Sequence, residues 1–148
     1  MAFAPIRIEN IADYVQSIED GALVLTQRKQ YTTDLDTASL IGSQIQECVV
    51  MNGDTIITQK TKYLKIYIDL MVSLPAKKRF ENTTFKFKDT DEKGLNGFVW
   101  IDKLNRSMQR KNAPGTMKEI INKIKANKYS LDMSIKLESG QLIYFKID

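Results

Sequence analysis

The amino-acid sequence predicts an α+β fold: one domain over residues 1–148, with a mostly antiparallel sheet and two to four short helices. Apolar residues at every even position from 64 to 74 predict a buried strand over residues 62–74. Alternating residues on both sides of Ser139-Gly140 predict a C-terminal hairpin over residues 129–148. Helical spacing appears between these strands. Strands grouped in this way, with helices between them, favour an antiparallel sheet.

Residues 10–27 predict a helix followed by a strand. Apolar side chains recur at positions i, i+3, i+4 and i+7 from Ile11 to Ile18, which is the spacing of one helical face. Asn10 is a suitable N-cap, and Gly21 is a suitable end for this helix. The apolar run that follows Gly21 predicts a short strand over residues 22–27.

A second helix and a hairpin are expected before the strand at 62–74. Asp36 or Thr37 is placed to cap a helix that runs through Ile45. Residues 45–50 are equally consistent with a strand, so both alternatives stay open. Asn52-Gly53 lies between two apolar runs, which is the strongest short-range signal for a β-hairpin.

Two strands are predicted in the centre of the chain. Phe85 and Phe87 alternate with lysines over residues 83–89, so we expect a strand with its phenylalanines inside and its lysines in solvent. Residues 97–101 predict a second, shorter strand. Pro75 ends the strand at 62–74, because proline cannot donate to a sheet.

Two helices are predicted after these strands. Ile101, Leu104 and Met108 have helical spacing, so we expect a helix over residues 101–110. Thr116, followed three residues later by Glu119, has the pattern of a capping box that starts a further helix. The expected apolar face of that helix consists of Met117, Ile120, Ile121 and Ile124.

Several classes of chemistry are excluded by composition. The chain has no histidine, the commonest general base and a common zinc ligand. Cys48 is the only cysteine, which rules out an internal disulfide, and its apolar neighbours predict a buried, inert thiol. No apolar run approaches the ~18 residues of a membrane span. The first ten residues lack an export signal. We therefore expect a cytoplasmic protein with no membrane contact and no cofactor.

Charge is unevenly distributed along the chain. Residues 1–59 carry three basic and eight acidic residues, a net charge of −5. Residues 60–128 carry seventeen basic and seven acidic residues, a net charge of +10, and the hairpin at 129–148 is close to neutral. Such segregation indicates a polyanionic partner or an acidic protein surface.

One cluster resembles a metal site in its residue types alone. Asp69, followed by Asp91, Glu92 and Lys93, fits the acid and acid-x-lysine pattern with which many nucleases hold Mg²⁺. In those nucleases the second cluster lies on a core strand, whereas in this chain it lies in a glycine-containing loop. We therefore expect no metal site and no catalytic residues, with a metal-dependent nuclease as the enzymatic alternative.

A cationic sheet face is the expected functional surface. If the even positions of 62–74 are buried, Tyr63, Lys65 and Tyr67 lie exposed on the opposite face. Two tyrosines that flank a lysine suit unpaired bases and a phosphate. The other expected contacts are cationic residues at the edges of this face: Lys77, Lys78, Arg79, Lys86, Lys88, Arg106 and Arg110.

We therefore expect a non-catalytic protein that binds nucleic acid, single-stranded rather than duplex. The alternative is a structural or assembly component, of the phage or mobile-element type, whose basic middle docks on an acidic protein surface. The opposite charges of residues 1–59 and 60–128 also make self-association between subunits an expectation.

Overall fold

The computed structural model describes residues 14–27, 30–58, 60–90 and 96–148. The chain divides into two units, Met1–Gln30 and Tyr31–Asp148, and each is considered separately. Together they confirm the predicted fold class, because the described residues form mostly antiparallel sheets and two α-helices. Among these residues, neither helix has the length and apolar character that crossing a bilayer requires.

The first unit contains an antiparallel hairpin. Strand β1 (Tyr14–Glu19) pairs with β2 (Ala22–Gln27), which confirms the strand predicted at 22–27. The helix predicted before Gly21 is wrong over residues 14–19, and its start lies outside the described residues. The reason is the turn: Asp20 and Gly21 have φ angles of 51° and 79°, and a two-residue turn with both φ angles positive favours a hairpin.

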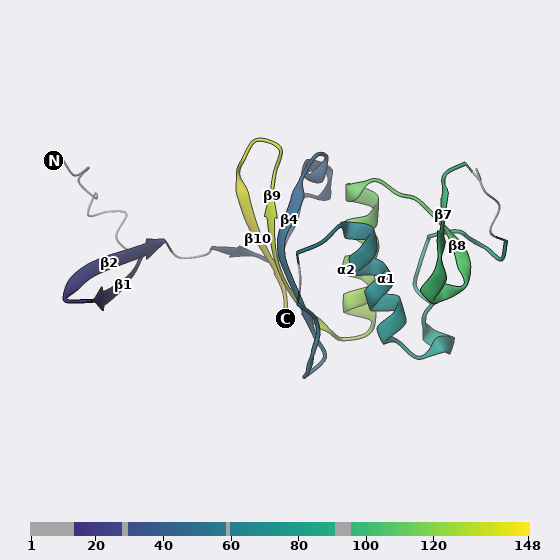
Figure 1. The fold of residues 1–148 in the computed structure, drawn as a ribbon, viewed down its shortest axis with the longest axis horizontal. Coiled ribbons are helices and arrows are strands. Elements are labelled where there is room, and N and C mark those ends of the chain that lie inside the picture. The colour runs from purple at the N-terminus through teal and green to yellow at the C-terminus, as the bar shows by residue number, and fades with distance from the viewer. Residues whose placement is uncertain (1–13, 28–29, 59, 91–95) are drawn as a thin grey trace. The chain divides into compact units, whose positions relative to one another are not determined.

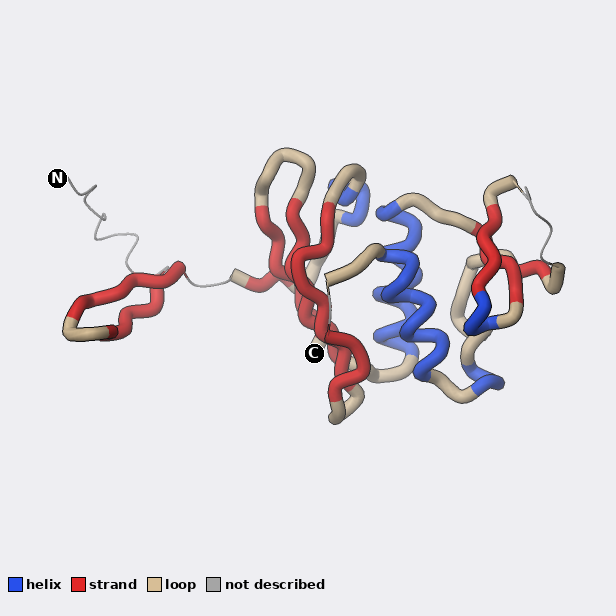
Figure 2. Tube along the Cα trace, in the orientation of Figure 1, coloured by secondary structure: helices blue, strands red, loops and turns tan. Residues whose placement is uncertain are grey.

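The second unit is built on a five-stranded sheet (Figures 1 and 2). Its strand order is β3-β10-β9-β4-β5, and every neighbouring pair is antiparallel except β3 with β10. The strands are β3 (Tyr31–Thr32), β4 (Gln44–Met51), β5 (Thr55–Thr58), β9 (Ser130–Lys136) and β10 (Leu142–Ile147).

Both hairpins predicted for this sheet are confirmed. Gly53 in the β4–β5 turn has a φ of 101°, and Gly140 in the β9–β10 turn has a φ of 92°. Of the two alternatives for Ile45, the strand is right, because Ile45 lies in β4. The helix capped by Asp36 is only a short 3-10 turn, Thr37–Leu40, after which Gly42 adopts a φ of 73°.

Two helices lie between the five-stranded sheet and a smaller sheet (Figure 1). Helix α1 spans Tyr63–Ser73 and α2 spans Ala113–Ala126. The core contains apolar side chains from both helices and from the strands beside them, including Cys48, Ile66, Leu70, Met117, Ile120, Met133 and Phe145.

The strand predicted over 62–74 is wrong, because these residues form α1. The segment carries two apolar periodicities at once. Besides the even positions, apolar residues recur at helical spacing, and the residues buried on this second stripe are Tyr63, Ile66, Tyr67, Leu70 and Met71. Packing of this stripe against the core decided between the two patterns.

The smaller sheet has three antiparallel strands in the order β6-β8-β7. Strand β7 (Phe98–Ile101) confirms the strand predicted there, whereas the strand predicted at 83–89 forms only as β6 (Phe87–Lys88). The helix predicted over 101–110 is wrong. The 3-10 turn Asp102–Leu104 ends at Asn105, whose φ of 53° redirects the chain into β8 (Arg106–Gln109).

Helix α2 begins three residues before the predicted capping box. The Asn112 side chain accepts a hydrogen bond from the backbone N–H of Gly115 at 2.9 Å, and proline fits the first helical turn. Thr116 instead donates to the carbonyl of Lys111, and Glu119 contacts a neighbouring segment. The predicted apolar face is confirmed, since Met117, Ile120 and Ile124 are buried and Ile121 packs against the core.

Candidate nucleic-acid interface

The two tyrosines predicted to stack on bases lie on the buried side of α1. Tyr67 has no exposed surface, and its ring centroid is 4.8 Å from that of Phe85. Burial raises the pKa of Tyr67 to about 12. Tyr63 is 8% exposed, and its hydroxyl lies 2.7 Å from that of Ser43. The prediction of a Tyr63/Tyr67 stacking face is therefore wrong, because the helical stripe buries both rings.

The cations nearest to these tyrosines have different environments. Lys65 is exposed on α1 and forms an ion pair with Asp69 at 3.3 Å. Lys77 and Lys78 are exposed in the 3-10 turn Ala76–Lys78, and neither forms an ion pair with any other described residue. Both remain available for an anionic partner.

Arg79 has a structural role at the end of α1. Its guanidinium donates to the carbonyl oxygens of Leu74 at 3.0 Å and Val72 at 3.3 Å. These carbonyls lie near the C-terminus of the helix, where backbone acceptors lack intrahelical donors. A positive charge is also favourable at this end of a helix dipole. The guanidinium of Arg79 is therefore already hydrogen-bonded within the protein, unlike the ammonium groups of Lys77 and Lys78.

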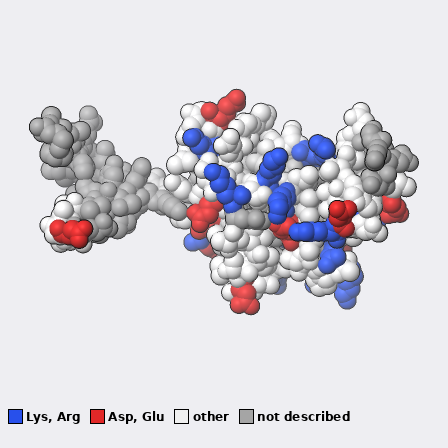
Figure 3. Space-filling model, viewed as in Figure 1, with Lys and Arg blue, Asp and Glu red and all other residues white. Residues whose placement is uncertain are grey.

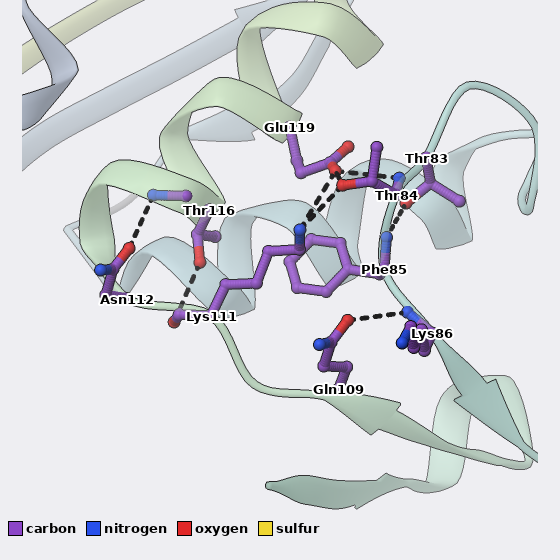
Figure 4. Close-up of polar contacts among 10 residues, drawn as sticks. Thr83, Thr84, Phe85, Lys86, Gln109, Lys111, Asn112, Thr116 and Glu119 are labelled. Atoms are coloured by element: carbon purple, nitrogen blue, oxygen red, sulfur yellow. Dashed lines mark hydrogen bonds and ion pairs between the residues drawn. The ribbon is translucent and has the colours of Figure 1, made fainter.

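A polar cluster centred on the buried Glu119 of α2 holds the segment that leads into the three-stranded sheet (Figure 4). One carboxylate oxygen of Glu119 accepts hydrogen bonds from the backbone N–H of Thr84, at 2.9 Å, and from the Thr84 hydroxyl. The ammonium of Lys111 lies 3.7 Å from the same oxygen and 5.2 Å from the centroid of Phe85. The cluster anchors the start of this segment to the helix.

Lys123 provides a second anchor one helical turn further along α2. It is 1% exposed, and its ammonium donates to the carbonyl oxygens of Arg79 at 2.7 Å and Glu81 at 2.6 Å. Burial lowers the pKa of Lys123, while the charges of Glu119 and Glu81 oppose that shift. The hydrogen bonds to these two carbonyls account for the presence of a buried ammonium at this position.

The three-stranded sheet has two distinct faces. Strand pairing places Lys88, Ser107 and Trp100 in one row. The next row, with Phe87, Met108 and Val99, lies on the opposite face, and Met108 is fully buried there. The face that carries Trp100 is therefore the one opposite Met108, and we call it the outer face. It consists of Lys88, Phe98, Trp100, Ser107 and Gln109. Ser107, on the middle strand, is only 3% exposed, and its hydroxyl donates to the carbonyl oxygen of Thr90.

Two aromatic rings lie on the outer face beside a lysine. Phe98 and Trp100 are two residues apart on β7, and both are partly exposed. The Lys88 ammonium lies 4.7 Å from the centroid of Phe98, and the indole N–H of Trp100 donates to Asp102 at 2.7 Å. Rings next to a cation form the arrangement that was expected of Tyr63 and Tyr67, but on a different element.

The remaining predicted cations surround this small sheet. Arg106 forms an ion pair with Asp89 at 3.0 Å and lies 4.7 Å from the centroid of Phe80. Lys86 and Arg110 are exposed, and neither has an ion pair within the described part of the chain. Figure 3 shows a broken band of Lys and Arg side chains across one face of the second unit, with single acidic residues between them.

Phe98 and Trp100 were not among the residues predicted to contact a ligand. The sequence does contain a signal, because the two rings alternate with Val99 and Ile101 in a run that predicts a strand. Side chains alternate between the two faces of a strand, so both rings lie on one face. Only the pairing of Val99 with the buried Met108 shows that the opposite face is the buried one.

Of the four candidate metal residues, the structure describes only Asp69. Asp69 lies on α1, 3.3 Å from the ammonium of Lys65 and 3.7 Å from that of Lys103. Asp91, Glu92 and Lys93 lie outside the described residues. No group of three metal-ligating side chains occurs in the ranges that the structure covers. Comparison with protein-family models, curated proteins and solved structures found no match to this chain.

Proposed function

We propose that this chain is a non-catalytic protein that binds single-stranded nucleic acid on the outer face of the three-stranded sheet. The observation that carries the proposal is that Phe98 and Trp100 lie on that face together with Lys88. Unpaired bases stack on such rings, and each stacked base contributes about 1–3 kcal/mol. Bases in a duplex are already stacked, so the arrangement favours a single strand.

The phosphate contacts are assigned to cations near this face. Lys86 precedes β6 and Arg110 follows β8. Lys77 and Lys78 lie in the turn before Phe80, whose ring packs edge-on against Phe87 on the opposite face of β6, with 4.9 Å between centroids. They are therefore assigned to the part of the nucleic-acid strand that continues past the edge of the sheet. Together with Lys88 these residues supply five cations for a flexible phosphate backbone. Backbone charge supplies affinity that is independent of base sequence.

Intrinsic fluorescence provides a direct test, because Trp100 is the only tryptophan in the chain. Titration with an unlabelled single-stranded oligonucleotide is expected to quench this fluorescence as bases stack on the indole. A duplex of the same length and salt concentration is expected to quench it less. Absence of quenching at low salt, with no binding by anisotropy of a labelled strand, would overturn the proposal.

Salt dependence and matched variants separate stacking from charge. If five cations neutralise phosphates, the slope of log affinity against log salt is expected to be about −3.5, from about −0.7 for each contact on a single strand. Replacement of Lys77 and Lys78 by alanine is expected to flatten that slope. Phe98→Ala is expected to weaken binding and leave the slope unchanged, because the ring carries no charge. Tyr31→Ala, which removes a ring on another sheet, is the control and is expected to have no effect.

A second candidate function, a structural or assembly component, is favoured by the hairpin of the first unit. Ile18 and Leu23 are paired directly across β1 and β2, and they are 77% and 65% exposed. Two-stranded hairpins are only marginally stable alone in water, so apolar contact with a second copy of the chain would stabilise this one. Sedimentation over a range of concentrations tests this candidate, and an Ile18→Thr, Leu23→Thr variant is expected to remain monomeric.

A further inference from the structure

A groove of about 730 Å³ lies where the start of β4 meets the start of α1. This volume is within the range of small-molecule sites in proteins. One wall consists of backbone and side chains at positions 43–45, and the other consists of residues 60–63 together with Lys65. Its residues are distinct from those of the outer face of the three-stranded sheet.

The groove is strongly cationic. Lys60, Lys62 and Lys65 all line it, and no acidic residue is among the described residues of its lining. Lys65 shares its charge with Asp69, whereas Lys60 and Lys62 have no ion pair with another residue that the structure describes. Lys60 and Lys62, with a partial contribution from Lys65, attract an anion of high charge, and the attraction is greater in a recess than on an open surface.

A hydrogen bond joins the two chain segments that line the groove. The Ser43 hydroxyl donates to the carbonyl oxygen of Leu40, so the Tyr63 hydroxyl is the donor in its 2.7 Å contact with Ser43. The Tyr63 hydroxyl is protonated at neutral pH, as an ordinary tyrosine is, and burial raises its pKa further. The shape of the groove is therefore formed before a ligand arrives, which lowers the entropic cost of binding.

The lining combines polar and apolar parts. Gln44 and Thr61 offer hydrogen-bonding groups next to the lysines, while Ile45, the Tyr63 ring and the aliphatic lysine stems offer apolar contact. A ligand that matches both parts has a charged phosphate group and a flat, largely apolar ring.

We propose that this groove is a binding site for a nucleoside phosphate. The lysines hold the phosphate groups and the apolar lining receives the base. A free nucleotide and the 5′-phosphorylated end of a strand share this chemistry. The site uses residues other than Phe98 and Trp100, so it does not depend on the proposed nucleic-acid surface.

Calorimetry at low salt, with ATP, AMP, adenosine and tripolyphosphate as probes, tests this inference. ATP is expected to bind more tightly than AMP because it carries more charge, and adenosine is expected not to bind at the same concentrations. Tripolyphosphate is expected to bind at least about tenfold more weakly than ATP, a difference of about 1.4 kcal/mol. No heat with ATP, or equal affinity for ATP and tripolyphosphate, would overturn the proposal.

Matched double variants distinguish binding of ATP in the groove from non-specific electrostatic binding of ATP to a basic protein. Lys60→Ala with Lys62→Ala is expected to weaken ATP binding by about tenfold or more. Lys118→Ala with Lys125→Ala removes the same charge on the exposed side of α2 and is expected to change it by less than about twofold. Equal losses in both double variants would overturn the assignment. The milder Lys60→Gln variant repeats the test if the alanine pair folds poorly, and equal melting temperatures verify folding.

Two further measurements separate the sources of the phosphate. An oligonucleotide with a 5′-phosphate that displaces ATP better than its unphosphorylated form indicates the end of a strand, and equal displacement indicates a free nucleotide. Both outcomes support the site. Trp100→Ala is expected to leave ATP binding unchanged, so failure of the nucleic-acid proposal is distinguishable from failure of this one. A loss of ATP binding in that variant would contradict the location of the nucleotide in the groove between β4 and α1.

Discussion

The side-chain ammonium of Lys123 donates to the carbonyl oxygen of Arg79 at 2.7 Å, which ties the segment after α1 to α2. Phe80, next to Arg79, contacts Phe87 of β6, so the position of the small sheet depends on this tie. The buried Lys123 side chain therefore contributes to the position of this segment through hydrogen bonds, as the apolar contacts around it do through packing.

Replacement of Lys123 by alanine is expected to reduce the free energy of unfolding by about 3 kcal/mol. Removal of the ammonium leaves two carbonyl acceptors without their donor, at about 1–3 kcal/mol each, and relief of the buried charge offsets part of that cost. Urea denaturation followed by circular dichroism measures the change. Lys125→Ala on the exposed side of the same helix is the control, with an expected effect below about 0.5 kcal/mol. Equal effects would contradict the structural role of Lys123.

Thr84 and Glu119 are expected to be energetically coupled. The carboxylate accepts both the backbone N–H and the hydroxyl of Thr84, and hydrogen bonds to a charged group are stronger than neutral ones. A double-mutant cycle with Thr84→Val and Glu119→Gln is expected to give a coupling energy of about 1–2 kcal/mol. The same cycle with Lys65→Ala and Asp69→Asn is expected to give a smaller value, below about 1 kcal/mol, because Lys65 is exposed. A value near zero for the first cycle would show that the contact is not formed in solution.

The thiol of Cys48 is expected not to react with a thiol reagent while the protein is folded. Cys48 is fully buried, and burial, with a smaller effect from the charge of Asp132, raises its pKa from 9.0 to about 12. The nucleophile is the thiolate, so labelling at pH 8 is expected to be slow in buffer and fast in urea. Rapid labelling of the folded protein would show that the β4 side of the core is open.

The same shift predicts how stability changes at alkaline pH. The unfolded chain loses the Cys48 proton near pH 9, whereas the folded chain keeps it until about pH 12. Because the folded-state pKa is raised, this contribution to stability is complete below pH 9 and is lost as the pH rises toward 12. Cys48→Ala removes this titration. Its unfolding free energy is therefore expected to fall less between pH 8 and pH 11 than that of the natural chain.

Residues 31–148 are expected to fold without the first unit. All the buried hydrophobic side chains of the core, in the described ranges, lie between Leu40 and Phe145. A chain that starts at Tyr31 keeps β3, which pairs with β10. Its melting temperature is expected to be within a few degrees of that of the whole chain. A large loss of stability would show that Met1–Gln30 contributes to the core of the second unit.

Local signals determined a substantial part of this fold. Asn52-Gly53 and Ser139-Gly140 predicted both hairpins of the five-stranded sheet, because positive φ angles are needed there and glycine adopts them at no steric cost. The apolar face of α2 followed from its spacing, since only the helical period brings Met117, Ile120 and Ile124 together. The lack of histidine and the single cysteine excluded whole classes of chemistry by composition alone.

Tertiary structure decided the elements whose patterns were ambiguous. Residues 62–74 carry both a two-residue and a helical apolar period, and burial of Tyr63 and Tyr67 in the core selected the helix. Met108 has helical spacing from Leu104. However, Asn105 between them adopts a left-handed conformation that ends the 3-10 turn, and Met108 lies in β8, paired with Val99. The outer face was decided in the same way. The alternation of side chains along β7 places Phe98 and Trp100 on one side of the strand. That side is partly exposed because the row on the other side, with Val99 and Met108, packs against the core. Such packing joins residues that are distant in the chain, and no local pattern contains it.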